Sequence, residues 1–230
     1  MKNLISAKKA RAVMGWLLLP AFLLTRNIAE ANLLVNGSFE SGPSAGSFVN
    51  LAGGTTSITG WVVTGEGIDY IGTLWAPADG THSLDLDGSV ASTTTPPFVH
   101  GGIAQTFATT AGTNYLVTFD LAGNPFGAPT IKPLGVFAAA QQTNFTFDVT
   151  GKNASNMGWL PENWTFTANG ASTTLEFRSL TVSPFTGFGP ALDNVSVTAI
   201  TVPPSVPEPY SLLLLGFGLI GFAAWRRSTR

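Results

Sequence analysis

Residues 114–122 read Asn-Tyr-Leu-Val-Thr-Phe-Asp-Leu-Ala, and this stretch decides the fold class. Its large apolar side chains recur at every second position, at Tyr115, Val117, Phe119 and Leu121. Successive side chains of a strand point to opposite faces, so these four share one face. A second alternating run later in the chain, with Leu175 and Phe177 on one face, predicts two sheets packed face to face.

The same pattern extends over residues 32–200, where short alternating runs are interrupted by Gly, Asn, Asp or Pro clusters. The predicted strands are Leu33–Val35, Ile58–Thr64, Ile68–Ile71, Ser83–Asp87, Gly102–Phe107, Asn114–Ala122, Leu134–Ala140, Asn144–Val149, Asn163–Thr167, Ser172–Ser179 and Ala191–Ala199. No window carries a helical stripe of useful length. We therefore expect an all-β domain, a jelly-roll β-sandwich of two antiparallel sheets.

The charges are segregated along the chain. Between Asn32 and Ser205 there are three basic residues against eleven acidic ones, a net charge of −8, whereas the remaining basic residues lie near the two ends. Nucleic-acid binding requires a basic face, so this balance argues against it and is compatible with calcium or neutral sugars. With no cysteine, neither disulfides nor cysteine metal sites can hold the fold.

The N-terminus has the three regions of a secretory signal. A basic stretch precedes an apolar run from Ala12 to Leu24, and the sequence Ala29-Glu-Ala31 follows as a cleavage site. An uncut signal anchor is the alternative, but the apolar run is shorter than the ~20 residues that span a bilayer. We predict that residues 1–31 direct export through the Sec machinery and that the mature chain begins at Asn32.

The C-terminus combines a stiff linker with an apolar helix. Residues 201–209 contain four prolines, which keep this segment extended. Residues 210–225 are apolar without interruption, and as a helix they would reach roughly 24 Å, close to the ~30 Å of a bilayer core. The positive-inside rule then places the tail, residues 226–230, in the cytoplasm and the domain outside.

Three features follow one another in this tail: Pro207-Glu208-Pro209, the apolar run that begins at Leu212, and Arg226-Arg227. With these three features the tail resembles the PEP-CTERM sorting signal of Gram-negative bacteria. It implies an exosortase as partner, a membrane-anchored precursor, and release or anchoring outside the cell, commonly in organisms that make exopolysaccharide.

Six short motifs frame nearly the whole domain. They are Leu33-Leu-Val-Asn-Gly-Ser-Phe-Glu40, Ile58-Thr-Gly-Trp61, Asp79-Gly-Thr-His-Ser-Leu-Asp85, Gly102-Ile-Ala-Gln105-Thr-Phe, Gly112-Thr-Asn-Tyr115 and Ala191-Leu-Asp193-Asn-Val195. In these motifs the domain resembles DUF642 and choice-of-anchor jelly rolls, which are similar to galactose-binding and carbohydrate-binding modules. A shared fold does not specify a ligand, so function must be argued from the site.

The resemblance implies a structural calcium ion. In similar modules the acids of the opening and closing motifs meet beside Ca²⁺, and here these would be Glu40 and Asp193. Two carboxylates from distant strand ends would suit a cation that prefers six to eight oxygen ligands. Asp85 could add a ligand, although Asp85 and Asp87 also fit a plain turn. The alternative for Glu40 and Asp193 is that they are solvated edge charges or turn formers.

Sugar binding usually needs exposed aromatic rings. We expect Trp75, Trp159 and Tyr70 as candidate platforms, because the two tryptophans fall in Gly/Pro-rich stretches, whereas Trp61 follows Gly60 at a strand start and is expected in the core.

Catalysis is not expected. The sequence has no cysteine nucleophile, no H-E-x-x-H motif, no P-loop, and only two histidines, His82 and His100. A glycosidase pair remains open among the carboxylates Glu66, Asp69, Asp120 and Glu162. The leading hypothesis is a non-catalytic surface or matrix protein that binds polysaccharide or a neighbouring surface component. The alternatives are a glycan-active enzyme on the same scaffold and a purely structural coat protein.

Overall fold

The computed structural model describes residues 31–89, 100–181 and 187–201, together with Gly216, Phe217, Leu219 and residues 225–228. Its strands form two sheets. The six-stranded sheet orders β1 (Phe48–Ala52), β3 (Gly67–Ile71), β4 (Ser83–Asp85), β11 (Pro190–Ala199), β6 (Asn114–Gly123) and β9 (Leu160–Thr167). The five-stranded sheet orders β2 (Val62–Thr64), β5 (Gly102–Ala108), β10 (Ser172–Ser179), β7 (Ile131–Ala138) and β8 (Gln141–Asp148).

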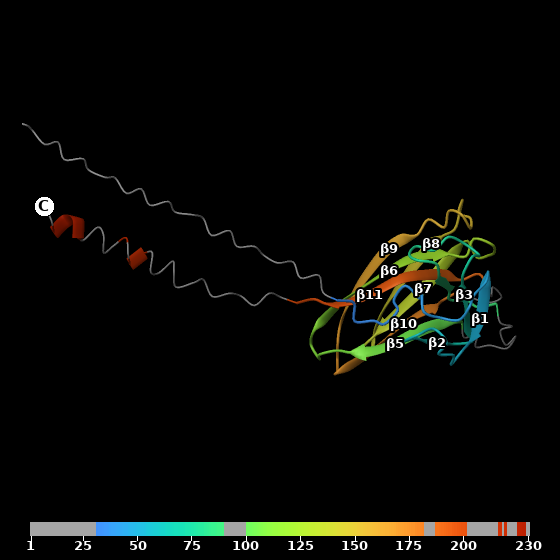
Figure 1. Cartoon of the computed structure of the whole chain (residues 1–230), viewed down its shortest axis with the longest axis horizontal. Coiled ribbons are helices and arrows are strands. Elements are labelled where there is room, and N and C mark those ends of the chain that lie inside the picture. The colour runs from blue at the N-terminus through green and yellow to red at the C-terminus, as the bar shows by residue number, and fades with distance from the viewer. Residues whose placement is uncertain are drawn as a thin grey trace, which may run out of the picture.

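Every pairing between neighbouring strands is antiparallel. Only β7 and β8 are joined by a two-residue hairpin among the paired strands, so most neighbours come from distant parts of the chain. In Figure 1 the strands run along the length of the domain, and the blue N-terminal segment begins beside β11. There the Leu33 N–H donates to the Val197 carbonyl, 2.8 Å away. The first described segment is therefore tied to β11, the last strand of the domain.

One apolar core lies between the sheets. Phe119 of β6 packs edge-on against Phe177 of β10, with ring centroids 5.1 Å apart, and against Phe145 of β8 at 5.2 Å. At the other end of the sandwich, Phe107 of β5 meets Tyr115 of β6 at 6.4 Å. All buried hydrophobic side chains of the described chain fall between residues 34 and 197. The domain therefore contains its own core, as an independently folding unit must.

The all-β sandwich expected from the alternation is confirmed, with differences at the N-terminal side. Strand β1 was not predicted, because Phe-Val-Asn-Leu-Ala at residues 48–52 alternates poorly. Residues 33–35 form no strand. Asn32 instead bonds the Leu34 N–H, and Gln105 holds Val35 through two hydrogen bonds. The predicted strand from Ile58 shortens to β2, because the Trp61 N–H turns back to the Ile58 carbonyl.

All but Ala31 of the expected signal peptide, and all but Thr201 of the expected linker, lie outside the described residues, as do Pro207, Glu208 and Pro209. Within the predicted C-terminal helix, Gly216, Phe217 and Leu219 are helical, and so are residues 225–228, which include Arg226 and Arg227. Among the residues that the structure describes, no helix combines the length and apolar character needed to cross a membrane. The membrane-spanning helix stays a prediction.

Candidate functional site

The outer face of the five-stranded sheet gathers polar side chains around one aromatic ring. Leu175 and Phe177 of β10 point into the core, so the residues that alternate with them, Thr174, Glu176 and Arg178, point outward. The register places Phe137 of β7 directly beside Glu176. These side chains come from adjacent central strands and form the middle of the outer face.

An ion pair lies beside this ring. The Arg178 Nη2 donates to both carboxylate oxygens of Glu176, at 2.8 and 2.7 Å, and the Thr64 hydroxyl donates to Glu176 Oε1 at 2.8 Å. The Arg178 guanidinium carbon lies 5.1 Å from the centre of the Phe137 ring, within cation–π range. Within the described chain no hydrogen bond is made by Arg178 Nη1 or by the carboxamide of Gln142. The Arg178 Nη1 and the Gln142 carboxamide are therefore available for hydrogen bonds to a ligand.

A shallow hollow of about 300 Å³ opens at this place, and we call it the first hollow. Its lining comprises Phe137, Gln142, Thr174, Glu176 and the hairpin residues 138–141. The two turn residues, Ala139 and Ala140, have φ of 50° and 61°. A two-residue hairpin of this kind normally uses Asn-Gly, and a left-handed alanine costs roughly 1–2 kcal/mol. Such strain persists where the surroundings impose it and is frequent beside ligand sites.

The predicted metal ligands Glu40 and Asp193 are both bound to one loop, residues 78–82, which we call the clamped loop. Glu40 Oε1 accepts the N–H groups of Thr81 and His82, both at 2.9 Å. Asp193 Oδ2 accepts the N–H groups of Ala78 and Asp79 at 2.8 and 3.0 Å. The acids of the opening and closing motifs therefore both contact the clamped loop through its backbone donors, and their role as metal ligands stays a prediction.

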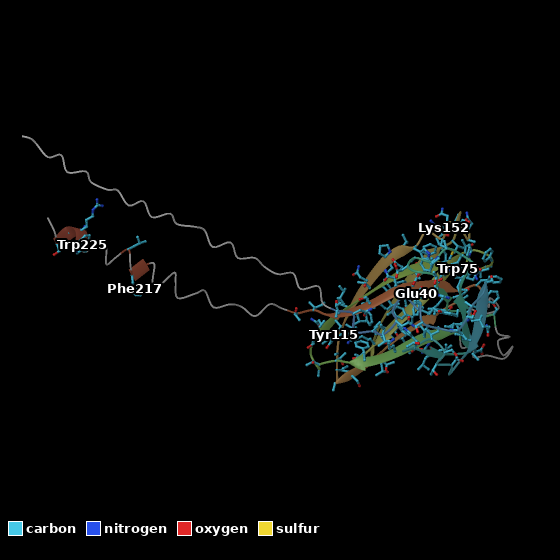
Figure 2. All side chains as sticks on the ribbon, viewed as in Figure 1. Glu40, Trp75, Tyr115, Lys152, Phe217 and Trp225 are labelled. Carbon is cyan, nitrogen blue, oxygen red and sulfur yellow. The ribbon has the colours of Figure 1, made fainter. Side chains whose placement is uncertain are left out.

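The two carboxyl groups differ in environment. Burial opposes ionisation of Glu40, but hydrogen bonds from Thr81 and His82 outweigh it and hold the Glu40 pKa below its ordinary value. Asp193 is fully buried, and burial raises its pKa to about 7 although three N–H groups stabilise its anion. Figure 2 places Glu40 and Trp75 toward one end of the sandwich and Tyr115 at the other.

The third predicted ligand, Asp85, belongs to a separate buried polar cluster. Its Oδ1 accepts the N–H groups of Asp87 and Gly189, and its Oδ2 accepts from Asn124 Nδ2 at 2.7 Å. Burial raises the pKa of Asp85 to about 7. Close by, the buried Lys132 donates to two backbone carbonyls, and burial lowers its pKa to about 8.

A calcium ion at these residues would require six to eight oxygen ligands. The clamped loop presents N–H donors to Glu40 and Asp193, and an N–H group cannot ligate a cation. Asp85 has other partners. Across the described ranges, no three His, Cys, Asp or Glu side chains are grouped so that they could hold a metal ion. A calcium ion between Glu40 and Asp193 would need carbonyl oxygens for most of its shell, so calcium binding stays a prediction.

The predicted aromatic platforms lie mostly inside the domain. Tyr70 has no exposed surface, and its hydroxyl donates to the Phe39 carbonyl at 2.6 Å. Trp75 is 3% exposed, and its indole N–H donates to the Ser83 hydroxyl. Neither ring offers a face to a sugar, and the Tyr70 ring is stacked on the His82 ring of the clamped loop. Trp159 is half-buried and donates to the Ala76 carbonyl, whereas Trp61 is a core residue as expected.

Sequence reasoning missed Phe137, Gln142, Glu176 and Arg178. The available signal was the alternation of β10, because the inward assignment of Leu175 and Phe177 already turns Glu176 and Arg178 outward. Their position beside Phe137 depends on the β7–β10 register, which cannot be read from the sequence alone.

One further sequence motif lacks the structural context that its chemistry requires. Residues 42–46 read Gly-Pro-Ser-Ala-Gly, which matches the nucleophile pattern G-x-S-x-G. That chemistry requires a strand before the serine and a helix after it. In the structure Ser44 is exposed on an irregular segment, and strand β1 begins two residues after Gly46.

Several solved structures are similar to this chain. A family 61 carbohydrate-binding module in complex with β-1,4-galactotriose has a TM-score of 0.45 at 14% identity, covering 73% of this chain and 97% of that one. A family 35 module from Clostridium thermocellum gives 0.41 at 10% identity, covering 65% and 97%. An arabinose-bound α-L-arabinofuranosidase gives 0.49 at 14%, covering 75% and 27%. The sandwich assignment rests on the strand pairing above.

Sequence comparisons address both parts of the chain. Halomucin of Haloquadratum walsbyi is 30% identical over 196 residues, which cover 82% of this chain and 2% of that protein, so this chain spans a very small part of its relative. Residues 205–228 match the PEP-CTERM protein-sorting motif, which confirms the resemblance of the tail and indicates export. Residues 32–198 match the profile described as "Protein of unknown function (DUF642)", and the chain belongs to the DUF642 family.

Proposed function

We propose that this protein is an exported, non-catalytic surface or matrix protein whose sandwich binds polysaccharide at the first hollow. The observation that carries the proposal is the association of one aromatic ring, Phe137, with an ion pair whose guanidinium retains an unused donor. A flat apolar surface ringed by a few directed polar groups is what a sugar-binding site needs.

The chemistry fits a pyranose in two ways. The exposed part of Phe137 can pack against the C–H face of a sugar ring. Glu176, Gln142 and Arg178 supply both acceptors and donors, so adjacent hydroxyl groups can be bound in pairs. The Thr106 and Thr174 hydroxyls, 2.7 Å apart on neighbouring strands, extend this polar surface along the sheet.

The net negative charge of the domain restricts the class of glycan that it can bind. The domain carries eleven acidic residues against three basic ones, so long anionic glycans are repelled from it as a whole. We therefore expect neutral chains to bind better than polyuronates at low ionic strength, and the difference to shrink as salt screens the charges.

The sorting motif supports a location at the cell surface or in the extracellular matrix. A chain that carries a signal peptide and a PEP-CTERM motif would cross the inner membrane through the Sec machinery, remain anchored as a precursor, and then be processed by an exosortase. The domain would then act at the cell surface or in the extracellular matrix, where exopolysaccharide is the abundant ligand.

The test is affinity electrophoresis of residues 32–201 through gels that contain galactan, xylan or polygalacturonate. We expect retardation in at least one neutral glycan and a loss of at least tenfold in affinity for Phe137→Ala. Phe126→Ala is the matched control, because Phe126 is 54% exposed and lies outside the hollow. Wild-type affinity in Phe137→Ala, or no retardation in any gel, would contradict the proposal. Release of reducing sugar would favour the enzyme alternative.

A further inference from the structure

Gly135 lies within β7, two residues before Phe137 and therefore on the same outer face of the five-stranded sheet. A glycine inside a strand weakens it and often marks a place that another group approaches closely. At Gly135 the approaching group is the Phe137 ring. A Cβ atom added to Gly135 would lie 2.7 Å from Phe137 Cε2 and 2.9 Å from Phe137 Cζ. The ring therefore occupies the space that any other residue at position 135 would need.

These two distances give the direction in which the Phe137 ring points. Cε2 and Cζ belong to the end of the ring farthest from the backbone, so the ring extends along β7 toward Gly135. It therefore points away from the turn at Ala139 and Ala140, which follows Phe137 in the chain. Leu180 Cδ1 lies 3.2 Å from the same added atom and borders this space. We call the space above Gly135 the ring seat.

The first hollow lies on the side that the ring leaves free. Its lining comprises Phe137, the turn-side residues 138–142, and Thr174 and Glu176 of β10. Leu175 pairs with Ala138, so Thr174 lies beside the turn. The hollow is thus the space between the Phe137 ring and the hairpin turn. A ring that pointed toward the turn would fill it.

Gly135 also brings Arg178 to the ring. The register places Arg178 directly opposite Gly135 on one side and Asn144 directly opposite on the other. Because Gly135 has no side chain, nothing on β7 stands between the guanidinium and the ring end, and the guanidinium carbon lies 5.1 Å from the Phe137 ring centre. The same glycine therefore supports the direction of the ring and its cation–π contact.

We propose that Gly135 is a positioning residue for glycan binding, which holds the Phe137 ring in the ring seat and so keeps the first hollow open. This inference rests on the proposed function, because it assigns a role to a residue behind the same site. Gly135 acts through Phe137 and need not touch the ligand.

A methyl group at position 135 should displace the ring rather than the backbone. The two atoms that it would meet form the free end of a half-buried side chain, which can rotate into other staggered positions. Rotation away from Gly135 carries the ring toward the turn and into the first hollow. Glycan affinity should therefore fall, whereas the fold should be retained.

The first experiment is affinity electrophoresis of residues 32–201 in galactan and xylan gels. We expect Gly135→Ala to bind about fivefold or more weakly than the wild type. Gly170→Ala is the matched control, because a Cβ there would meet only the Ser172 carbonyl oxygen, at an ordinary 3.7 Å. The double variant Gly135→Ala/Phe137→Ala should bind no more weakly than Phe137→Ala, since the ring that Gly135 positions is then absent.

The second experiment observes the ring seat by NMR in the unmutated domain, so it does not depend on the folding of Gly135→Ala. We expect a nuclear Overhauser effect between the Gly135 Hα protons and the Hε and Hζ protons of Phe137. This signal should persist when galactotriose or xylotriose is added, while the amide resonances of residues 138–142 shift. Its absence, or its loss on addition of the sugar, would overturn the proposal.

The outcomes separate the role of Gly135 from the proposed function. Wild-type retention in Gly135→Ala together with a loss in Phe137→Ala would overturn the role of Gly135 and leave the proposed function intact. Reduced stability of Gly135→Ala with unchanged retention would also overturn it, because the ring would then only cover a strand glycine. A double variant weaker than Phe137→Ala would show that Gly135 acts by another route. No retardation of the wild type in either gel would overturn both proposals.

Discussion

The clamped loop and the first hollow both present carboxylates, but they use them in opposite ways. Asp193 is fully buried and accepts backbone N–H groups with both oxygens. Glu176 lies at the surface of the sheet, paired with an arginine that is 40% exposed and keeps a free donor. The comparison teaches that acids which hold the fold are saturated by backbone donors, whereas acids suited to ligands sit among unused groups.

Removal of the buried acid gives the largest expected effect. Asp193→Ala removes the buried acceptor of the Ala78 and Asp79 N–H groups, which should cost about 2–4 kcal/mol of unfolding free energy. Urea denaturation of residues 32–201 measures it. The exposed-acid variant Asp148→Ala should stay within about 0.5 kcal/mol of wild type. Equal losses in both variants would remove the distinction between the two kinds of carboxylate.

The pH dependence of stability sharpens the same contrast. Burial raises the pKa of both Asp85 and Asp193 to about 7 from an ordinary 3.8, so between these values the native state holds protons that the unfolded chain has lost. Their contribution to stability is fully present below about pH 4 and is lost as the pH rises through 7.

We therefore expect the unfolding free energy to fall by on the order of 2 kcal/mol for each of the two groups between pH 5 and pH 7.5. Glu40 does not oppose this trend, because its pKa is lowered and it is ionised throughout the window. Urea denaturation at several pH values provides the measurement. Asp193→Asn should flatten the slope, and a stability that rises over this range would contradict the assignment.

Calcium tests whether the clamped loop is held by hydrogen bonds alone. If an ion is bound between Glu40 and Asp193 in the native state only, calcium at ten times its Kd adds about 1.4 kcal/mol of stability. The melting temperature should then rise with calcium, fall with chelator, and become insensitive to both in Asp193→Ala. A melting temperature that ignores chelator would show that the N–H donors suffice.

The smallest expected effect concerns the hairpin beside the first hollow. Replacing Ala139 and Ala140 by Asn and Gly supplies residues that tolerate positive φ, so the double variant should be stabilised by about 1 kcal/mol. Thermal denaturation provides the measurement. A destabilised variant would mean that the alanine turn is not strained.

Much of the fold could be predicted because period-two alternation is local. It located ten of the eleven strands to within a few residues and missed β1, whose short run alternates poorly. It also predicted a strand at residues 33–35, where hydrogen bonds from Asn32 and Gln105 impose another course. Gln105 and Val35 are 70 residues apart in the sequence, so no local pattern could predict their hydrogen bond.

The candidate sites were predicted less well. Trp75 and Tyr70 were selected by residue type, but exposure depends on which segments cover them. The pairing of Glu40 and Asp193 with one loop was foreseen only as a meeting of two motifs, and the backbone donors between them carry no signal in the side-chain sequence.

The sequence by itself determined the alternation, the acidic balance of the domain and the sorting motif, because each is a property of residue order or composition. Only the tertiary structure decided which side chains are neighbours. Phe137 lies beside Glu176, and Asp120 beside Asn194, through strand register and sheet order, which are set by packing across the whole core. A ligand site is a set of such neighbours, so its position follows from the fold.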